Sequence, residues 1–199
     1  MANDTKDRMI EATARLIQSR GPHGVSMNDI LSESGAPRGS LYFHFPGGKK
    51  SLVLAAMQAG IQEATEILKK TLREANNPAD GIRAFFEAAA TEMVESDYAF
   101  GCPVAPVILD APGIGSELAT ACRAAVDEWT HLYRDALAEA GLADNRAERL
   151  AVTIVAGLEG ALIMARGSHD PAPIREVGDE LATMIGQALG AERSKPAAS

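Results

Sequence analysis

Apolar residues recur every three to four positions along most of the chain, which is the period of helices with one buried face. This pattern predicts helices over about residues 5–20, 27–34, 38–44, 49–75, 78–96, 104–109, 116–140, 145–166 and 173–189. Glycine, proline or asparagine lies between most of these stretches, and no segment alternates with the period of a strand. The pattern therefore predicts an all-α chain of about nine helices.

The first 48 residues predict three short helices with a helix-turn-helix arrangement. Ser26 precedes the second helix as an N-cap, and Asp29 follows where a capping box has its acidic residue. A tight turn at 35–37 then leads into the short helix over 38–44. Two short helices joined by a glycine-containing turn are typical of DNA-binding domains. We therefore expect a DNA-binding domain at 1–48 and a second, helical domain at 49–199.

Composition refines this picture without excluding a nucleic-acid partner. The net charge is −8, but residues 1–52 hold seven Lys/Arg against five Asp/Glu, so the acidic excess lies in the remainder. The two cysteines form no metal-binding spacing, and the polar N-terminus lacks a signal-peptide core. The apolar run at 151–165 contains Glu159 and is shorter than a membrane span, so a buried helix is expected. We expect a cytoplasmic protein with no metal, no cofactor and no membrane partner.

The stretch RGSLYFHFPGGKK, residues 38–50, carries the residues expected to contact DNA. The second helix of a helix-turn-helix enters the major groove with its N-terminal residues toward the bases. Arg38 has the donor geometry for guanine, Gly39 permits close approach, and Ser40 can bond a base or a phosphate. Contacts of Arg38 and Ser40 to phosphate alone are the alternative.

Four further polar residues are expected to bind the DNA backbone, and Ser26 has a similar role at the preceding helix. Tyr42 and His44 carry a polar tip suited to phosphate, although a core tyrosine and a packing histidine are the alternatives. Lys49 and Lys50 begin the next helix, where backbone N–H groups favour an anion. The glycines of this stretch lack the sequence of a nucleotide-binding loop, and no strand precedes them.

The segment from Tyr98 to Gly115 is apolar and rich in proline and glycine, with room only for a short helix. Such a segment packs irregularly against neighbouring helices, which favours an apolar pocket, although plain core packing is the alternative. The predicted pocket residues are Phe85, Phe86, Met93, Phe100, Cys102, Val104, Val107, Ile108, Trp129 and Tyr133. A redox role for Cys102 is a second alternative.

The last two helices carry a pattern expected of a two-fold interface. Small residues allow close helix approach on one helix, and a heptad-like apolar stripe follows on the next. The predicted dimer residues are Gly157, Gly160, Ala161, Val177, Leu181, Met184 and Ile185. They would form a four-helix bundle between two copies of the chain.

The signature S-x-x-x-I…S-G-A-P-R-G-S-L-Y-x-H-F…K-x-x-L, from Ser26 to Leu52, resembles the N-terminal signature of TetR-type transcriptional regulators. The extra glycine in FPGGK and the later GCPVAPV are similar to the LmrA/YxaF-like branch. The resemblance implies an all-helical homodimer with a ligand pocket, in which Phe43 joins the base-facing residues and Leu41 and Phe45 are core. Leu31, Ser34 and Lys50 depart from residues common in the family.

These observations predict a ligand-responsive transcriptional repressor that binds a palindromic operator as a homodimer. A small lipophilic or aromatic effector would release it, and a cysteine redox switch is the alternative. An enzyme is not expected. A hydrolase would need Cys102 or Ser116 as nucleophile with His131, and no catalytic motif surrounds these residues.

Overall fold

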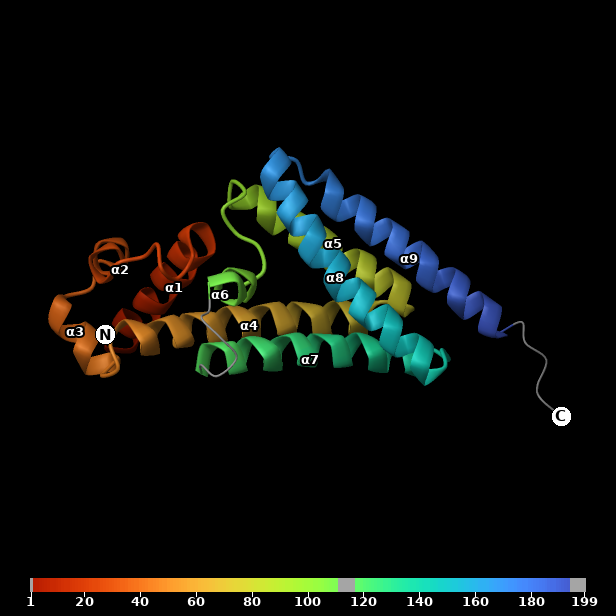
Figure 1. The fold of residues 1–199 in the computed structure, drawn as a ribbon, viewed down its shortest axis with the longest axis horizontal. Helices are drawn as coiled ribbons and strands as arrows, with labels where there is room; N and C mark the ends of the chain where they lie inside the picture. The colour runs from red at the N-terminus through yellow and green to blue at the C-terminus, as the bar shows by residue number, and fades with distance from the viewer. Residues whose placement is uncertain (1, 111–116, 194–199) are drawn as a thin grey trace. The chain divides into compact units, whose positions relative to one another are not determined.

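The computed structural model describes residues 2–110 and 117–193, and over this part of the chain it contains nine helices and no strand (Figure 1). The helices are α1 (Ala2–Arg20), α2 (Met27–Ser34), α3 (Arg38–His44), α4 (Lys49–Glu74), α5 (Pro78–Glu95), α6 (Ala105–Asp110), α7 (Glu117–Glu139), α8 (Asp144–Ser168) and α9 (Ala172–Arg193). The predicted all-α fold is confirmed. Ser116, where one helix was predicted to begin, lies outside the described residues.

The helix ends differ from the prediction by a few residues, with physical reasons. Helix α9 begins at Ala172, before Pro173, because a proline in the first turn has no N–H group that the helix needs. Helix α8 continues to Ser168, and His169 ends it in the left-handed conformation with φ of 56°.

The chain divides into two compact units, which we call the first unit (residues 1–64 and 99–125) and the second unit (65–98 and 126–199). This division differs from the predicted domains at 1–48 and 49–199, which remain a functional prediction. Helices α4 and α7 contribute residues to both units because each is one uninterrupted helix.

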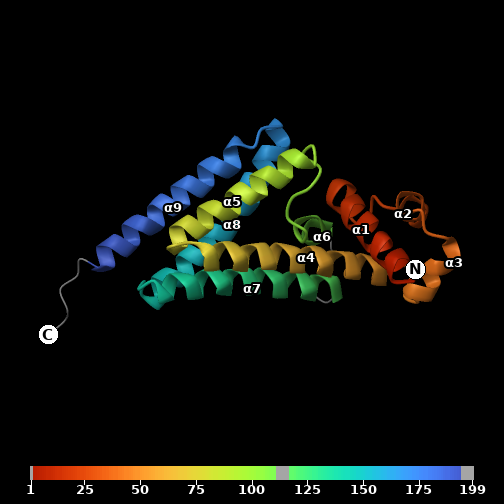
Figure 2. The same ribbon diagram turned by 180° about the vertical axis from the view of Figure 1, so that it is seen from behind.

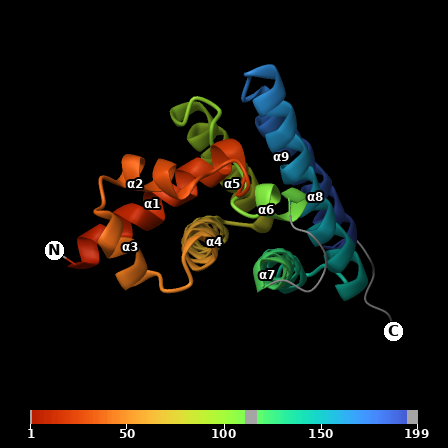
Figure 3. The ribbon, with the colours of Figure 1, turned by 60° about the vertical axis from the view of Figure 1, so that its left-hand side comes forward.

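In the first unit, α1 packs against α2 and α3, and Figure 3 shows these three helices grouped near the beginning of α4. Their common core holds α3 through Leu41 and through Phe45, which directly follows the helix. Full burial of a leucine side chain stabilises a fold by roughly 1.5–3 kcal/mol. The core consists of Met9, Leu16, Val25, Ile30, Ala36, Leu41, Phe45 and Leu52.

Local hydrogen bonds fix the turn that orients α3. The Ser26 side chain accepts from the Asp29 N–H group at 3.1 Å, and the Asp29 carboxylate accepts from the Ser26 N–H group at 2.7 Å. The predicted capping box is therefore confirmed. Gly35 ends α2 with φ of 61°, a left-handed conformation that glycine adopts without steric penalty. Arg8 donates to the carbonyl of Ser34 at 3.1 Å and so satisfies a helix-terminal acceptor.

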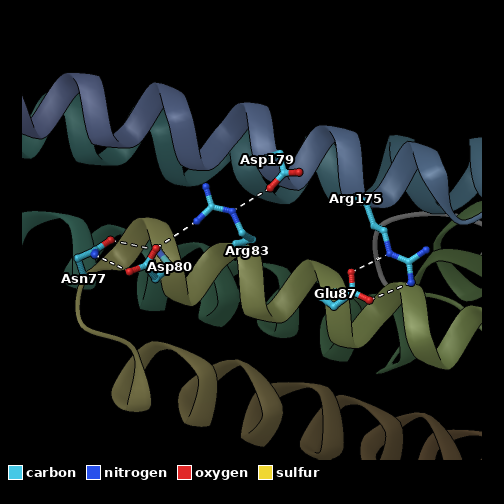
Figure 4. Close-up of polar contacts among 6 residues, drawn as sticks. All are labelled: Asn77, Asp80, Arg83, Glu87, Arg175 and Asp179. Atoms are coloured by element: carbon cyan, nitrogen blue, oxygen red, sulfur yellow. Dashed lines mark hydrogen bonds and ion pairs between the residues drawn. The ribbon is translucent and has the colours of Figure 1, made fainter.

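In the second unit, α9 lies alongside both α5 and α8, as Figures 1 and 2 show. The α5–α9 contact is close because Gly178 presents bare backbone to the side chain of Phe86. Its exposed edge carries ion pairs from Arg83 to Asp179 at 2.8 Å and from Arg175 to Glu87 at 2.7 Å (Figure 4). Exposed pairs of this kind contribute about 0–1 kcal/mol each, so the apolar contact dominates.

Among the described residues, α8 is the one helix long and apolar enough to span a membrane. One of its faces is buried in the second unit, through residues that include Leu150, Ile154 and Leu162. The buried helix expected from the sequence is thus buried on one face only, because Val152, Ile163 and Met164 on the rest of its surface are exposed.

Candidate DNA-binding surface and effector site

Helix α3 separates its core side chains from a strongly exposed face. Leu41 is 1% exposed, whereas Tyr42 is 62% exposed and Phe43 is 78% exposed. Arg38 and Gly39, one turn earlier, are exposed as well. The alternative of a core tyrosine at position 42 is therefore wrong. Large exposed aromatic residues on so short a helix indicate a surface that contacts a partner.

Two smaller side chains border this face. His44 is half-buried, and its ring meets that of Phe43 edge-on with centroids 4.9 Å apart. Ser40 is also half-buried, and its N–H group donates to the carbonyl of Pro37 at 2.9 Å. The Ser40 hydroxyl lies on the helix turn that Arg38 begins. The position of His44 is compatible with both of its predicted roles, packing and phosphate contact.

Ser26 is exposed at the start of α2, where its capping role orients the side chain. Hydrogen bonding by Ser26, through its side chain first and its backbone N–H second, lowers the pKa of the Asp29 carboxyl below its ordinary value. Positive charge on Arg20 and Lys49 acts in the same direction. Asp29 is thus ionised at neutral pH and keeps the capping box intact.

Both lysines predicted to bind phosphate lie in the first turn of α4. Lys49 is half-buried and Lys50 is exposed. The ammonium group of Lys50 lies 3.8 Å from the carboxylate of Glu117, with both side chains more than half exposed. A pair this exposed is weak, so an incoming phosphate can replace the carboxylate. This lysine, which departs from the family pattern, has a local acidic partner that sequence reasoning missed.

The predicted effector residues fall into two sets, one in each unit. In the second unit, Phe86 and Met93 are buried in the core, each 1% exposed. Phe85 is half-buried and meets the ring of Tyr133 edge-on, with centroids 6.5 Å apart. Trp129 is 8% exposed, and its indole N–H donates to the hydroxyl of Thr65 at 2.8 Å. The structure thus brings Phe85 and Tyr133 together.

The Tyr133 side chain has an unusual polar environment. It is 1% exposed, and its hydroxyl group has no hydrogen-bond partner within the described residues. Burial raises the pKa of the phenol far above its ordinary value, so it remains neutral. The buried hydroxyl is therefore a hydrogen-bond donor that nothing in the described structure uses.

In the first unit, the predicted effector residues lie on α6 and the segment before it. Val104 and Val107 are 1% exposed, Phe100 and Cys102 are half-buried, and Ile108 is 49% exposed. The other cysteine, Cys122, contacts Met57 at 3.4 Å between the sulfur atoms, and burial raises the pKa of its thiol.

The same segment is attached to the helix-turn-helix scaffold by contacts that sequence reasoning missed. The N–H group of Gly101 donates to the side-chain oxygen of Gln18 in α1 at 3.1 Å. Pro103 packs against Gly60 in α4, where an added β-carbon would lie 3.0 Å away. These partners are far apart along the chain, by 83 residues for Gln18 and Gly101, so no local pattern reveals them.

Most of the predicted dimer residues pack inside a single chain and not on its surface. Gly157 faces Val177 and Leu181 of the same chain, and a β-carbon there would lie 3.3 Å and 3.2 Å from them. Ala161, Leu181 and Ile185 are buried within the protomer, at 1%, 5% and 0% exposure. They fill the core of a single chain because the apolar stripes of α8 and α9 first pack on each other.

The exposed apolar residues of α8 and α9 are a different set. Gly160 and Met184, both predicted, are exposed. Val152, Ile163 and Met164 are exposed too, at 54%, 65% and 61%, and the prediction missed them. The available signal was that α8 is apolar on more than one face, which indicates two packing surfaces.

The helix-turn-helix of α2 and α3 has a capped first helix and an exposed second helix, α3, that contains no Asp or Glu. These features are typical of DNA-binding transcriptional regulators. Residues 9–56 match the tetR family of bacterial regulatory proteins, and residues 78–180 match the C-terminal domain of LmrA/YxaF-like transcriptional regulators. The chain belongs to the TetR family, in its LmrA/YxaF-like branch. The prediction of a regulator rather than an enzyme is thereby confirmed.

Relatives and solved structures agree with this assignment. The chain is 31% identical over 188 residues to the uncharacterized HTH-type transcriptional regulator Rv0196 of Mycobacterium tuberculosis, covering 90% of this chain and 93% of the relative. It is 29% identical over 174 residues to the HTH-type transcriptional regulator LmrA of Bacillus subtilis, covering 87% and 93%. A TetR transcriptional regulator from Chloroflexus aurantiacus has the same fold, with a TM-score of 0.80, 27% identity and coverage of 94% and 96%.

The fold also occurs in a DNA complex. A cysteine mutant of the TetR-family regulator CifR, bound to 26-bp double-strand operator DNA, matches with a TM-score of 0.72 and 20% identity, covering 96% of each chain. At this identity, the likeness concerns the fold alone.

Proposed function

We propose that this chain is a cytoplasmic repressor that binds a palindromic operator as a homodimer and releases it when a small apolar or aromatic effector binds. The observation that carries the proposal is the surface of α3, where Arg38, Tyr42 and Phe43 are exposed on a helix whose other face is buried. The buried core fixes α3 in place. A fixed, exposed helix of this kind supports a role in base recognition in the major groove.

In this proposal, the exposed face of α3 contacts the bases and its flanks contact the backbone. Arg38 donates to guanine, and Phe43 meets the apolar thymine methyl group or a sugar edge. Tyr42, His44 and Lys49 bind phosphates on either side of the groove. The oxygen of the Ser26 hydroxyl caps α2, and its proton would turn from the Asp29 carboxylate to a phosphate. Lys50 would exchange Glu117 for a phosphate.

The proposed dimer uses the exposed apolar face of the last two helices. Its members are Val152, Gly160, Ile163 and Met164 on α8 and Met184 on α9. Apolar side chains exposed along one side of a helix pair support a second copy as the occupant, because two such pairs form a four-helix bundle. Two copies would present two α3 helices to half-sites one DNA turn apart, roughly 34–36 Å.

The proposed effector response passes through the first unit. The segment at 100–104 carries predicted effector residues and is bonded to α1 through Gln18 and packed on α4 at Gly60. Movement of this segment would therefore displace α1, which packs against α2 and α3, and α4, which follows α3 in the chain. An effector shifts the equilibrium between a DNA-binding and a released conformation only if it binds one of them more tightly. An affinity difference of about 10⁴-fold changes the ratio of the two conformations from 1:99 to 99:1.

A binding assay with DNA from upstream of the protein's own coding sequence tests the proposal. We expect binding that survives competition by unrelated DNA and weakens steeply with salt. Only non-specific binding, in the presence and in the absence of candidate effectors, would contradict it.

A further inference from the structure

Two ion pairs between lysine and glutamate join α4 to α7. In the first, the ammonium group of Lys50 lies 3.8 Å from the carboxylate of Glu117. In the second, the ammonium group of Lys69 lies 3.2 Å from the carboxylate of Glu128. Both lysines belong to one uninterrupted helix, and the rise per residue of an α-helix separates them by roughly 28 Å along its axis. The two pairs are thus alike in chemistry but differ in their distance from the helix-turn-helix.

The first turn of α4 is anchored in the core of the helix-turn-helix. Leu52 is fully buried there, in the same cluster as Leu41 of α3. The backbone of Lys50 is therefore fixed to the domain that holds α3, while its side chain is 65% exposed. Glu117 is the first residue of α7, which lies outside the helix-turn-helix, and its side chain is 63% exposed. An acid from the rest of the chain thus pairs with a cation at the DNA-binding scaffold.

A carboxylate and a DNA phosphate compete for the same ammonium group, because each is an anion that accepts its hydrogen bonds. A second acid near this turn, Asp29, is committed elsewhere. It acts electrostatically on Lys49, but its carboxylate accepts from the Ser26 N–H group at 2.7 Å in the capping box. The carboxylate of Glu117, in contrast, contacts a lysine that is expected to bind phosphate. It would also lie within the Debye length of about 8–10 Å from a phosphate bound there, and would repel it.

We propose that Glu117 is an intramolecular competitor of the DNA backbone, which binds Lys50 in place of a phosphate and so lowers the affinity of the protein for DNA. This inference rests on the proposed function, because it concerns the DNA contact of the first turn of α4. It goes further by giving a residue outside the helix-turn-helix a direct role in setting the affinity for DNA. A conformational change that separates Glu117 from Lys50 frees the lysine for DNA, and one that brings them together strengthens the competition.

The salt dependence of DNA binding gives this competition a specific signature. A lysine that neutralises a phosphate releases cations condensed on the DNA, so the logarithm of the binding constant falls against the logarithm of the salt concentration with a slope of about −0.9 per contact. When Lys50 moves to a phosphate, the carboxylate of Glu117 is left without its lysine and attracts a cation from solution. This uptake offsets part of the release. Glu117→Gln removes the offset, so the slope should become steeper by up to about 0.9 per bound copy.

A double-mutant cycle separates the competition from other effects of charge. Its members are the full-length wild type, Glu117→Gln, Lys50→Gln and the protein with both substitutions. Glu128→Gln is the matched control, because it breaks the same kind of α4–α7 pair at Lys69, well beyond a Debye length from Lys50. Dissociation constants are measured for a duplex from upstream of the coding sequence and for an unrelated duplex of the same length. The unrelated duplex reports phosphate binding without sequence recognition.

Glu117→Gln is expected to bind both duplexes about three- to tenfold more tightly than the wild type at about 0.1 M salt, the size of one exposed charge interaction per copy. In the Lys50→Gln background, the same substitution should change the affinity by less than about twofold. Glu128→Gln should bind like the wild type. All variants should keep the unfolding midpoint of the wild type, because both ion pairs are exposed.

Unchanged or weaker DNA binding by Glu117→Gln would overturn the inference, and so would an equal gain in the Lys50→Gln background or in Glu128→Gln. A wild type that binds the two duplexes equally would contradict the repressor proposal alone, because the cycle on either duplex still measures the competition for Lys50. Absence of binding to both duplexes would overturn both proposals.

Discussion

The backbone of Gly178 in α9 lies so close to Phe86 in α5 that a β-carbon on residue 178 would be 2.7 Å from Cβ of Phe86 and 2.9 Å from its Cγ. Cβ of Phe86 is fixed by the backbone of α5, so no side-chain rotation relieves the 2.7 Å contact. The contact lets α5 and α9 run side by side and positions the ion pairs of Figure 4 along their edge.

Gly178→Ala is therefore expected to destabilise the protein by about 1–3 kcal/mol, because the added methyl group overpacks the α5–α9 contact. Gly186→Ala is the matched control on the same helix, since a β-carbon at position 186 meets nothing within 4 Å. It should be neutral or stabilise the helix by up to about 1 kcal/mol. Urea unfolding of both variants measures the difference, and equal stabilities would contradict the packing described.

Thr65→Val should leave the indole N–H of Trp129 buried without its acceptor. The structure predicts a loss of about 1–3 kcal/mol, together with a change in the emission of this single tryptophan. Thr71→Val is a suitable control on the same helix, because the Thr71 hydroxyl donates to the carbonyl of Leu68 in its own helix. Equal unfolding midpoints for the two variants would show that the Thr65–Trp129 bond contributes nothing.

The ion pair between Glu87 and Arg175 predicts a pH dependence of defined sign. The hydrogen bonds from Arg175 lower the pKa of the Glu87 carboxyl from 4.5. The contribution of the pair to the stability of the folded protein is thus fully present above pH 4.5, and it is lost as the pH falls through the depressed pKa. Because both groups are largely exposed, the contribution is below about 1 kcal/mol.

Glu87→Gln should accordingly be slightly less stable than the wild type at pH 7. The difference in the free energy of unfolding between the two proteins should vanish in acid and in about 1 M salt. Glu95→Gln, at the exposed C-terminal end of the same helix, serves as the control. The free energy of unfolding at several pH values measures both. A gap that widens as the pH falls would have the wrong sign for a depressed pKa.

Sequence reasoning succeeded where the signal is local. The nine helices follow from apolar spacing and chain breakers, and the Ser26–Asp29 capping box follows from two residues three positions apart. The exposed and buried faces of α3 follow from the interleaving of Leu41 with Tyr42 and Phe43.

It failed where long-range packing decides. Periodicity shows that Leu181 and Ile163 lie on apolar stripes, but it does not show that Leu181 packs inside its own chain while Ile163 is 65% exposed. The bond between Gln18 and Gly101 joins residues 83 positions apart, and the unpartnered hydroxyl of Tyr133 depends on what surrounds it. Contacts of this kind have no signature in local spacing.

The dimer proposal predicts a specific effect at Ile163. Ile163→Glu places a charge in the middle of the exposed apolar face of α8, so it should convert the dimer to a monomer without unfolding it. Gln62→Glu, an exposed position on α4 and so on neither helix of the proposed interface, is the control for added charge. Sedimentation velocity measures the mass of each protein. A monomeric wild type, or an Ile163→Glu protein that remains dimeric, would exclude this face as the interface.

Contact of the exposed face of α3 with DNA is the central claim, and Phe43→Ala tests it most directly. Its ring is 78% exposed, so its removal should leave the unfolding midpoint unchanged. Footprinting on DNA from upstream of the coding sequence is expected to show two protected half-sites with wild-type protein, and at least about tenfold weaker protection with Phe43→Ala. Absence of a protected site with the wild type, or full protection by Phe43→Ala, would contradict the account.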